Sequence, residues 1–144
     1  MTRTSARSSA RPDSAARRAA FRPILILLTS FLVVSVAMEA ALLVQSTTGG
    51  EVAIAVWIRC SLVLGSAVVL LLIALAAARG SRSSWLRLLI IAPIVVVAVV
   101  VIVSIPGFLP DWVRLEQAVC GALVLPAAIL TALPRTRALF PAGA

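Results

Sequence analysis

Residues 85–106 read WLRLLIIAPIVVVAVVVIVSIP, a run of 22 residues rich in valine and isoleucine that holds one charge, Arg87. A helix needs about 20 mostly apolar residues to cross the hydrocarbon core of a bilayer. This stretch therefore predicts a membrane-spanning helix. Three further windows have the same character, namely residues 24–44, 52–78 and 112–133. We expect an all-α polytopic membrane protein, a four-transmembrane-helix bundle.

The composition of the whole chain agrees with this expectation. Of 144 residues, 62% are hydrophobic and 12% are charged, and the mean hydropathy is +1.13. Soluble domains carry about 45–50% apolar and about 25% charged residues. The chain has no histidine, which removes the commonest metal ligand and the commonest general base. We therefore expect no metal, no cofactor and no enzymatic activity.

The arginines predict how the chain is oriented in the membrane. All 13 basic residues are arginine, and the formal net charge is +8. Eleven of them lie in residues 1–22, 79–87 and 134–144, whereas the connections 45–51 and 107–111 carry one acid each and no arginine. Basic residues are enriched on the cytoplasmic side of membrane proteins. We expect a multi-pass protein of the cell (plasma) membrane with both termini in the cytoplasm.

The same charges divide the chain into three regions. Residues 1–22 are rich in serine, alanine and arginine, a composition too poor in apolar residues to form a core. We expect a disordered basic cytoplasmic tail there, a transmembrane domain over residues 23–133, and a short cytoplasmic tail over residues 134–144. Arginines that flank long apolar runs favour anionic lipid headgroups as the partner, rather than nucleic acid.

Several residues are placed to contact the membrane interface. Arginine reaches headgroup phosphates from a helix end, and tryptophan is enriched at the headgroup level. On this basis the predicted lipid contacts are Arg17, Arg18, Arg22, Arg79, Arg82, Arg87 and Arg114, together with Trp85 and Trp112. Phe21, Phe108 and Phe140 also lie near expected interfaces.

Two charges lie inside the first two windows at the same expected depth. Glu39 and Arg59 are each ten residues from Gly49, where the first hairpin turns. An isolated charge at the centre of a membrane helix costs about 2.5–3.5 kcal/mol on insertion scales. A pair at equal depth on neighbouring helices would relieve both costs, so we expect an ion pair between Glu39 and Arg59.

The fourth window adds further polar residues at a similar level. Glu116 is a second candidate acid for Arg59, and Gln117 completes an expected intramembrane network of Glu39, Arg59, Glu116 and Gln117. Ser35 and Ser66 extend the polar faces of their helices toward the bilayer centre. Cys60 and Cys120 also lie at comparable depth, which leaves open either a disulfide or two small buried residues.

Two resemblances to known families follow from these residues. Glu39 in the first helix is similar in kind to the membrane-embedded glutamate of small multidrug transporters. Its position near the outer end and the strong charge bias depart from that family. The chain resembles small four-helix membrane proteins common in actinobacteria. The features that carry this resemblance are Glu39 late in the first helix, the Arg79–Arg87 connection and the Pro134-Arg135-x-Arg137 ending. That resemblance implies no activity.

Two functions from different classes are consistent with the sequence. The first is a non-enzymatic accessory, assembly or regulatory subunit of a membrane complex, with a membrane-protein partner or a second copy of the chain. The second is a small oligomeric transporter or channel that uses Glu39 and Arg59. Intramembrane ionisable residues favour the second, whereas short loops and polar residues in the outer half of the bundle favour the first.

Overall fold

The computed structural model describes residues 14–107 and 110–140, and these residues are helical apart from short connections. The helices are α1 (Ser14–Thr47), α2 (Ile54–Ala78), α3 (Arg82–Ser104), α4 (Asp111–Ala132) and the short α5 (Pro134–Arg137). Helices α1 to α4 are each long and apolar enough to cross a membrane. The all-helical, four-span prediction is confirmed.

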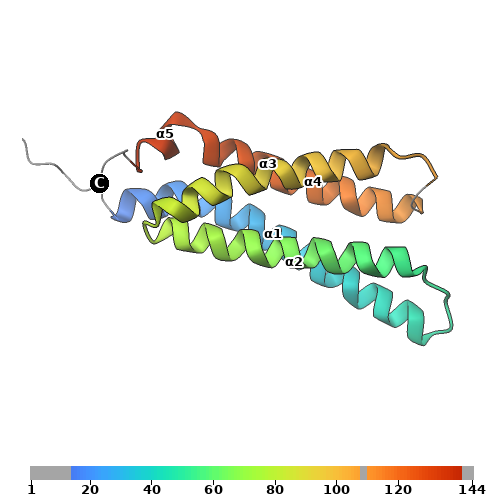
Figure 1. Ribbon diagram of the computed structural model, residues 1–144. Coiled ribbons are helices and arrows are strands. Elements are labelled where there is room, and N and C mark those ends of the chain that lie inside the picture. The colour runs from blue at the N-terminus through green and yellow to red at the C-terminus, as the bar shows by residue number, and fades with distance from the viewer. Residues whose placement is uncertain (1–13, 108–109, 141–144) are drawn as a thin grey trace, which may run out of the picture.

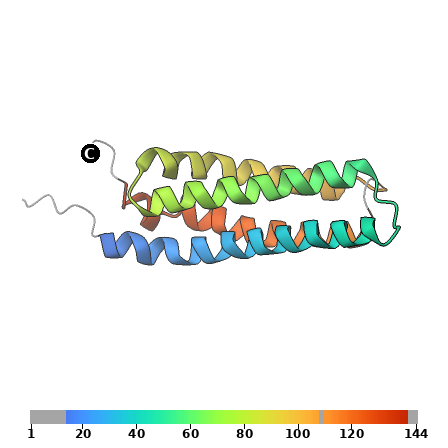
Figure 2. The ribbon, with the colours of Figure 1, turned by 90° about the horizontal axis from the view of Figure 1, so that it is seen from below.

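The four long helices form an antiparallel ring (Figure 1). Each packs against two neighbours, in the pairs α1–α2, α2–α3, α3–α4 and α4–α1. Helices α2 and α4 are therefore diagonal partners across the interior of the bundle. Figure 2 shows that the start of α1, the α2–α3 connection and α5 lie at one end, which we call the arginine end. The α1–α2 and α3–α4 connections lie at the other end, the acidic end.

The core forms because each long helix buries one stripe and exposes the rest. In α1 the buried residues are Phe21, Ile24, Leu28, Phe31, Ser35, Met38 and Leu42, which recur at the three- and four-residue spacing of one helix face. The remaining faces expose large apolar side chains, such as Val33 and Leu62. In a bilayer such faces contact lipid, which is as apolar as they are.

Helices α3 and α4 approach one another at a glycine. A Cβ added to Gly121 of α4 would lie 3.0 Å from Cγ1 of Val99 in α3. That is tighter than normal van der Waals contact, so the absent side chain permits the close approach. Gly65 of α2 has no atom within 4 Å of its Cβ position.

Residues at the arginine end are more ordered than the sequence predicts. Residues 14–22 are helical, so the expected disordered tail is wrong for them, and residues 1–13 lie outside the described part. The expected C-terminal tail also folds back, because Phe140 is 6% exposed and stacks on Trp85 with ring centroids 5.3 Å apart. Phe21 meets Phe140 edge-on at 6.0 Å.

The sequence predicts that Trp85 contacts lipid, but the structure buries it inside the bundle. It is 5% exposed, and its indole Nε1–H donates to the backbone carbonyl of Thr131 at 3.2 Å. A buried indole needs such an acceptor for its N–H. Trp112, in contrast, is 44% exposed near the start of α4.

Candidate functional site

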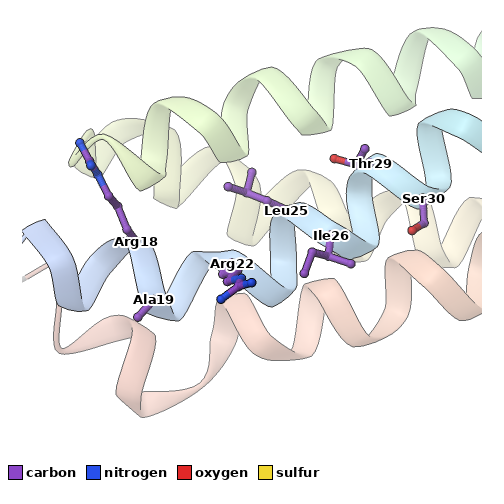
Figure 3. Close-up of a pocket in the computed structure, with 7 residues that line it drawn as sticks. All are labelled: Arg18, Ala19, Arg22, Leu25, Ile26, Thr29 and Ser30. Atoms are coloured by element: carbon purple, nitrogen blue, oxygen red, sulfur yellow. The ribbon is translucent and has the colours of Figure 1, made fainter.

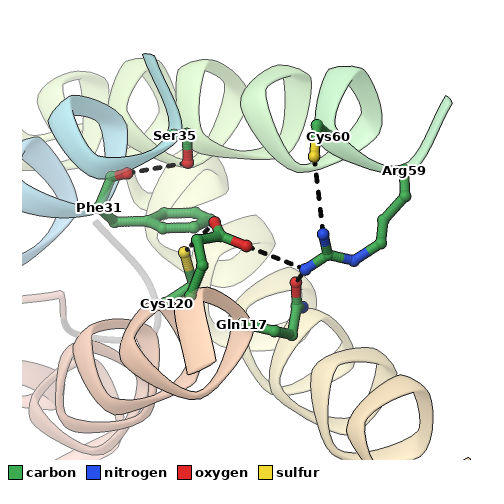
Figure 4. A network of polar contacts seen from close by, with 7 residues as sticks. Phe31, Ser35, Arg59, Cys60, Gln117 and Cys120 are labelled. Carbon is green, nitrogen blue, oxygen red and sulfur yellow. Dashed lines mark hydrogen bonds and ion pairs between the residues drawn. The ribbon is translucent and has the colours of Figure 1, made fainter. Parts of the chain in front are cut away.

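The most unusual feature of the bundle is a buried charge pair that joins the diagonal helices. Arg59 of α2 is 6% exposed, and its Nη2 lies 3.0 Å from Oε2 of Glu116 in α4. The same Nη2 donates to the side-chain carbonyl of Gln117. Figure 4 shows the guanidinium of Arg59 meeting Gln117 between the helices. We call Arg59, Glu116 and Gln117, with the neighbouring Cys60 and Cys120, the polar cluster.

The helix stripes explain why these residues meet. In α4 the buried positions include Val113, Gln117, Cys120 and Val124, so Gln117 faces the interior and Glu116 lies at the edge of the stripe. In α2 both Arg59 and Cys60 are buried. The long arginine side chain therefore starts on the inner face of one helix and spans the interior to the diagonal one.

The two cysteines take part in this cluster as thiols. Cys120 Sγ donates to Oε1 of Glu116 at 3.0 Å, and Cys60 Sγ accepts from Nη1 of Arg59 at 3.6 Å. Both cysteines are free and buried, so the disulfide that the sequence left open is not formed. The thiol contact to Glu116 was missed from the sequence, although Glu116 and Cys120 are four residues apart and share a helix face.

The expected ion pair between Glu39 and Arg59 is wrong. Glu116 is the acid that Arg59 contacts, while Oε1 of Glu39 is buried with no hydrogen-bond partner among residues 14–107 and 110–140. Glu39 follows Met38 of the buried α1 stripe and so points to the flank of the stripe. Glu39 and Arg59 both lie near Cys60, but the two side chains form no ion pair.

The two serines that were expected to extend the network form hydrogen bonds within their own helices. The Ser35 hydroxyl donates to the Phe31 carbonyl at 2.9 Å, and the Ser66 hydroxyl donates to the Leu62 carbonyl at 2.9 Å. Both bonds run back one turn along the same helix, a common arrangement in membrane helices. Ser35 also lies beside the thiol of Cys120, at the edge of the polar cluster.

Arg114 binds protein rather than extending freely to headgroups. Its Nη2 donates to the backbone carbonyl of Val103 at 3.2 Å, and its Nη1 lies 4.0 Å from Asp111. Val103 is in the last turn of α3, where carbonyls lack partners within the helix. Arg114 therefore satisfies the C-terminus of α3 from the start of α4, while 39% of its side chain stays exposed.

The arginine end divides into one packed and several exposed side chains. Arg17 packs on the α2–α3 connection, because a Cβ on Gly80 would lie 3.2 Å from Cζ of Arg17. It is therefore partly covered by protein rather than a simple lipid contact. The other arginines predicted there are exposed, namely Arg18, Arg22, Arg79, Arg82 and Arg87.

Arg18 and Arg22 border a shallow hollow on the surface of α1. It measures about 630 Å³ and continues past Leu25 and Ile26 to Thr29 and Ser30. Figure 3 shows the two arginines near the start of the helix, extending in different directions.

The arrangement of the polar cluster limits its chemistry. Arg59 is engaged by an acid and an amide, and no three His, Cys, Asp or Glu side chains among the described residues are grouped to hold a metal ion. The cluster can fix the diagonal helices relative to one another.

No protein-family model, curated protein or solved structure matches the chain.

Proposed function

We propose that this chain is a non-catalytic integral membrane protein that acts as an accessory, assembly or regulatory subunit of a membrane complex. The observation that carries the proposal is that the polar residues and two pairs of small residues face different sides of the helices. The polar cluster is directed inward and joins α2 to α4. Two pairs of small residues on α1 and α2, in contrast, are exposed on the outer surface of the bundle.

Two pairs of small residues at four-residue spacing support this division. Ala37 and Ala41 of α1 and Ser61 and Gly65 of α2 are all exposed on the bundle. Such pairs allow the backbones of two membrane helices to approach closely. Gly65 makes no intrachain contact that its lack of a side chain would explain. Ser61 and Gly65 also line a shallow hollow with Ile91 and Val95 of α3, where a transmembrane helix of a partner subunit would pack.

The proposal also includes an orientation in the membrane, which rests on the exposed arginines. The exposed arginines at the arginine end are Arg18, Arg22, Arg79, Arg82 and Arg87. Because basic residues are enriched on the cytoplasmic side of membrane proteins, this end faces the cytoplasm. The exposed arginines would then contact anionic headgroups of the inner leaflet of the cell membrane, each contributing about 1 kcal/mol. Cysteine labelling tests this: Glu51→Cys should react with a membrane-impermeant maleimide in intact cells, and Ser83→Cys only after permeabilisation. The reverse pattern would overturn the orientation.

Site-specific photo-crosslinking in native membranes tests the partner. A photoreactive amino acid at Gly65 should yield a discrete crosslinked band that contains a second polypeptide. The matched control is the same amino acid at Val100, which is 57% exposed on α3. A protein that stays monomeric after gentle extraction and gives no specific crosslink at Gly65 would refute the accessory-subunit function.

One observation favours a second candidate, a small oligomeric transporter or channel. Glu39 keeps a buried carboxylate oxygen without a hydrogen-bond partner in the described part of the chain, and such residues commonly exchange protons or bind ions in membrane proteins. Proteoliposome flux driven by an ion gradient tests it. A flux that the Glu39→Gln variant leaves unchanged would exclude this role.

A further inference from the structure

A second hollow lies on the side of the bundle between α2 and α3. It measures about 660 Å³ and runs from Ala55 and Ile105 near the acidic end to Ser66 and Val95. Along α2 this is eleven residues, or about 16 Å of helix. Its lining includes Ile58 and Leu62, which are 58% and 67% exposed. The hollow therefore opens sideways on the surface that faces the bilayer.

The charged and amide side chains of the lining lie toward one end of the hollow. Arg59 and Gln117 belong to the lining, together with many apolar side chains. Arg59 lies four residues from Ala55, at the end of the hollow that is nearer to the acidic end of the bundle. An amphipathic molecule would thus find its polar partner near the helix ends and its apolar surface toward the bilayer centre.

Arg59 has an unused hydrogen-bond donor at this place. Its Nη2 contacts Glu116 and Gln117, but its buried Nε has no partner in residues 14–107 and 110–140. A buried donor without an acceptor is rare, because its lost hydration is not replaced. The charge of Arg59 is already balanced by Glu116 at 3.0 Å. An uncharged acceptor, such as a carbonyl oxygen, is therefore the group that completes the site.

The depth of Arg59 matches one source of such carbonyls. Helix α2 has 25 residues, about 37 Å, against about 30 Å for the hydrocarbon core. With the excess shared by both ends, Arg59 lies about 4 Å inside the hydrocarbon boundary. The ester groups of phospholipids lie at that boundary, and their acyl chains run from it toward the bilayer centre.

We propose that this hollow binds one acyl chain of a phospholipid from the leaflet at the acidic end. The ester carbonyl accepts the Nε–H of Arg59, and the chain lies along the apolar lining toward Ser66 and Val95. Because Nε is buried, this hydrogen bond requires the side chains that cover it to move aside when the lipid binds. This lipid differs from the surrounding bilayer lipids because its carbonyl is hydrogen-bonded to the protein and its acyl chain lies in the hollow.

Comparison of ester and ether lipids tests the role of the carbonyl. Native mass spectrometry of the delipidated full chain would measure binding of a diacyl phosphatidylcholine and of its dialkyl ether analogue, which lacks the carbonyls. A zwitterionic headgroup keeps the exposed arginines from dominating the result. We expect the diacyl lipid to bind about fivefold more tightly, the factor that one hydrogen bond contributes.

A filled hollow provides the second measurement. Ala98 belongs to the lining, and Ala98→Phe should lower binding of the diacyl lipid at least about fivefold. The control is Val97→Phe, because Val97 is 61% exposed and is not part of the lining. Circular dichroism and thermal unfolding in detergent would verify that both variants fold.

Each outcome decides between the proposed lipid and ordinary surface lipid. Tighter binding of the ester lipid together with loss in Ala98→Phe alone supports the site. Equal binding of ester and ether lipids, or equal binding to Ala98→Phe and Val97→Phe, would overturn it. These measurements use the isolated protein, so they do not depend on whether a partner subunit packs on the bundle at Gly65.

Discussion

Arg59 and Glu116 form an ion pair across the interior of the bundle, with Nη2 and Oε2 3.0 Å apart. The two helices that carry them are diagonal, not adjacent, in the ring of four. Since the side chains of both residues are only 6% and 12% exposed, either charge would be left unpaired in a region of low dielectric constant if its partner were removed. The pair therefore fixes α2 relative to α4.

Breaking this pair on one side should destabilise the bundle. Arg59→Met should lower the free energy of unfolding by about 3 kcal/mol, because Glu116 then remains buried without a counter-ion. The double variant Arg59→Met/Glu116→Leu should lose less than the sum of the two single variants, with a coupling of at least about 1 kcal/mol. Denaturant unfolding in detergent micelles measures all four corners of the cycle, and additive losses would contradict the pair.

Glu39 should behave differently from Glu116. Because its Oε1 has no partner among the described residues, Glu39→Leu removes an unsatisfied polar group and should leave stability unchanged or raise it by about 1 kcal/mol. In a cycle with Arg59→Met the coupling should stay within about 0.5 kcal/mol. A coupling as large as that between Glu116 and Arg59 would instead support an ion pair between Glu39 and Arg59.

This contrast shows what the sequence can and cannot predict about the site. Depth follows from counting residues along the helices, and it correctly brings Glu39, Arg59 and Glu116 to one level. The direction in which each side chain points depends on the order of the helices in the ring and on the buried stripe of each. Arg59 lies on the inner face of α2, whereas Glu39 lies at the flank of α1, and counting does not distinguish these positions.

The helices themselves were predictable for a related reason. The length and hydropathy of a span are local properties, and the predicted windows 52–78, 85–106 and 112–133 end within three residues of α2, α3 and α4. The exception is α1, which begins at Ser14, ten residues before its window. Its first turns are polar, and they pack at the arginine end through contacts such as that of Arg17 with Gly80, which no composition reveals.

Gly121 and Gly65 should respond differently to the same substitution. Gly121→Leu places a side chain where Val99 Cγ1 is 3.0 Å from the Cβ position, and valine in a helix has little rotamer freedom to move away. We expect a loss of about 1–3 kcal/mol of stability. Gly65→Leu should leave the unfolding of the isolated chain nearly unchanged, since nothing lies within 4 Å. Equal losses would argue against a close α3–α4 contact.

Phe140 should stabilise the arginine end. Phe140→Ala removes the ring stacked on Trp85 and should lower the unfolding free energy by about 3 kcal/mol. In a background of Trp57→Phe and Trp112→Phe, the emission of Trp85 should shift to longer wavelength as water reaches the indole. Leu133→Ala is the control, because Leu133 is 39% exposed. An unshifted spectrum would place the C-terminal residues away from the tryptophan.

The length of α1 has a mechanical consequence. Its 34 residues span about 51 Å, whereas the hydrocarbon core is about 30 Å thick. The ten residues from Ser14 to Pro23 alone extend about 15 Å along the helix axis. Within these residues Arg17 packs on Gly80 and Phe21 packs on Phe140. A force applied at Ser14 would therefore reach the α2–α3 connection and the C-terminal residues as well as α1.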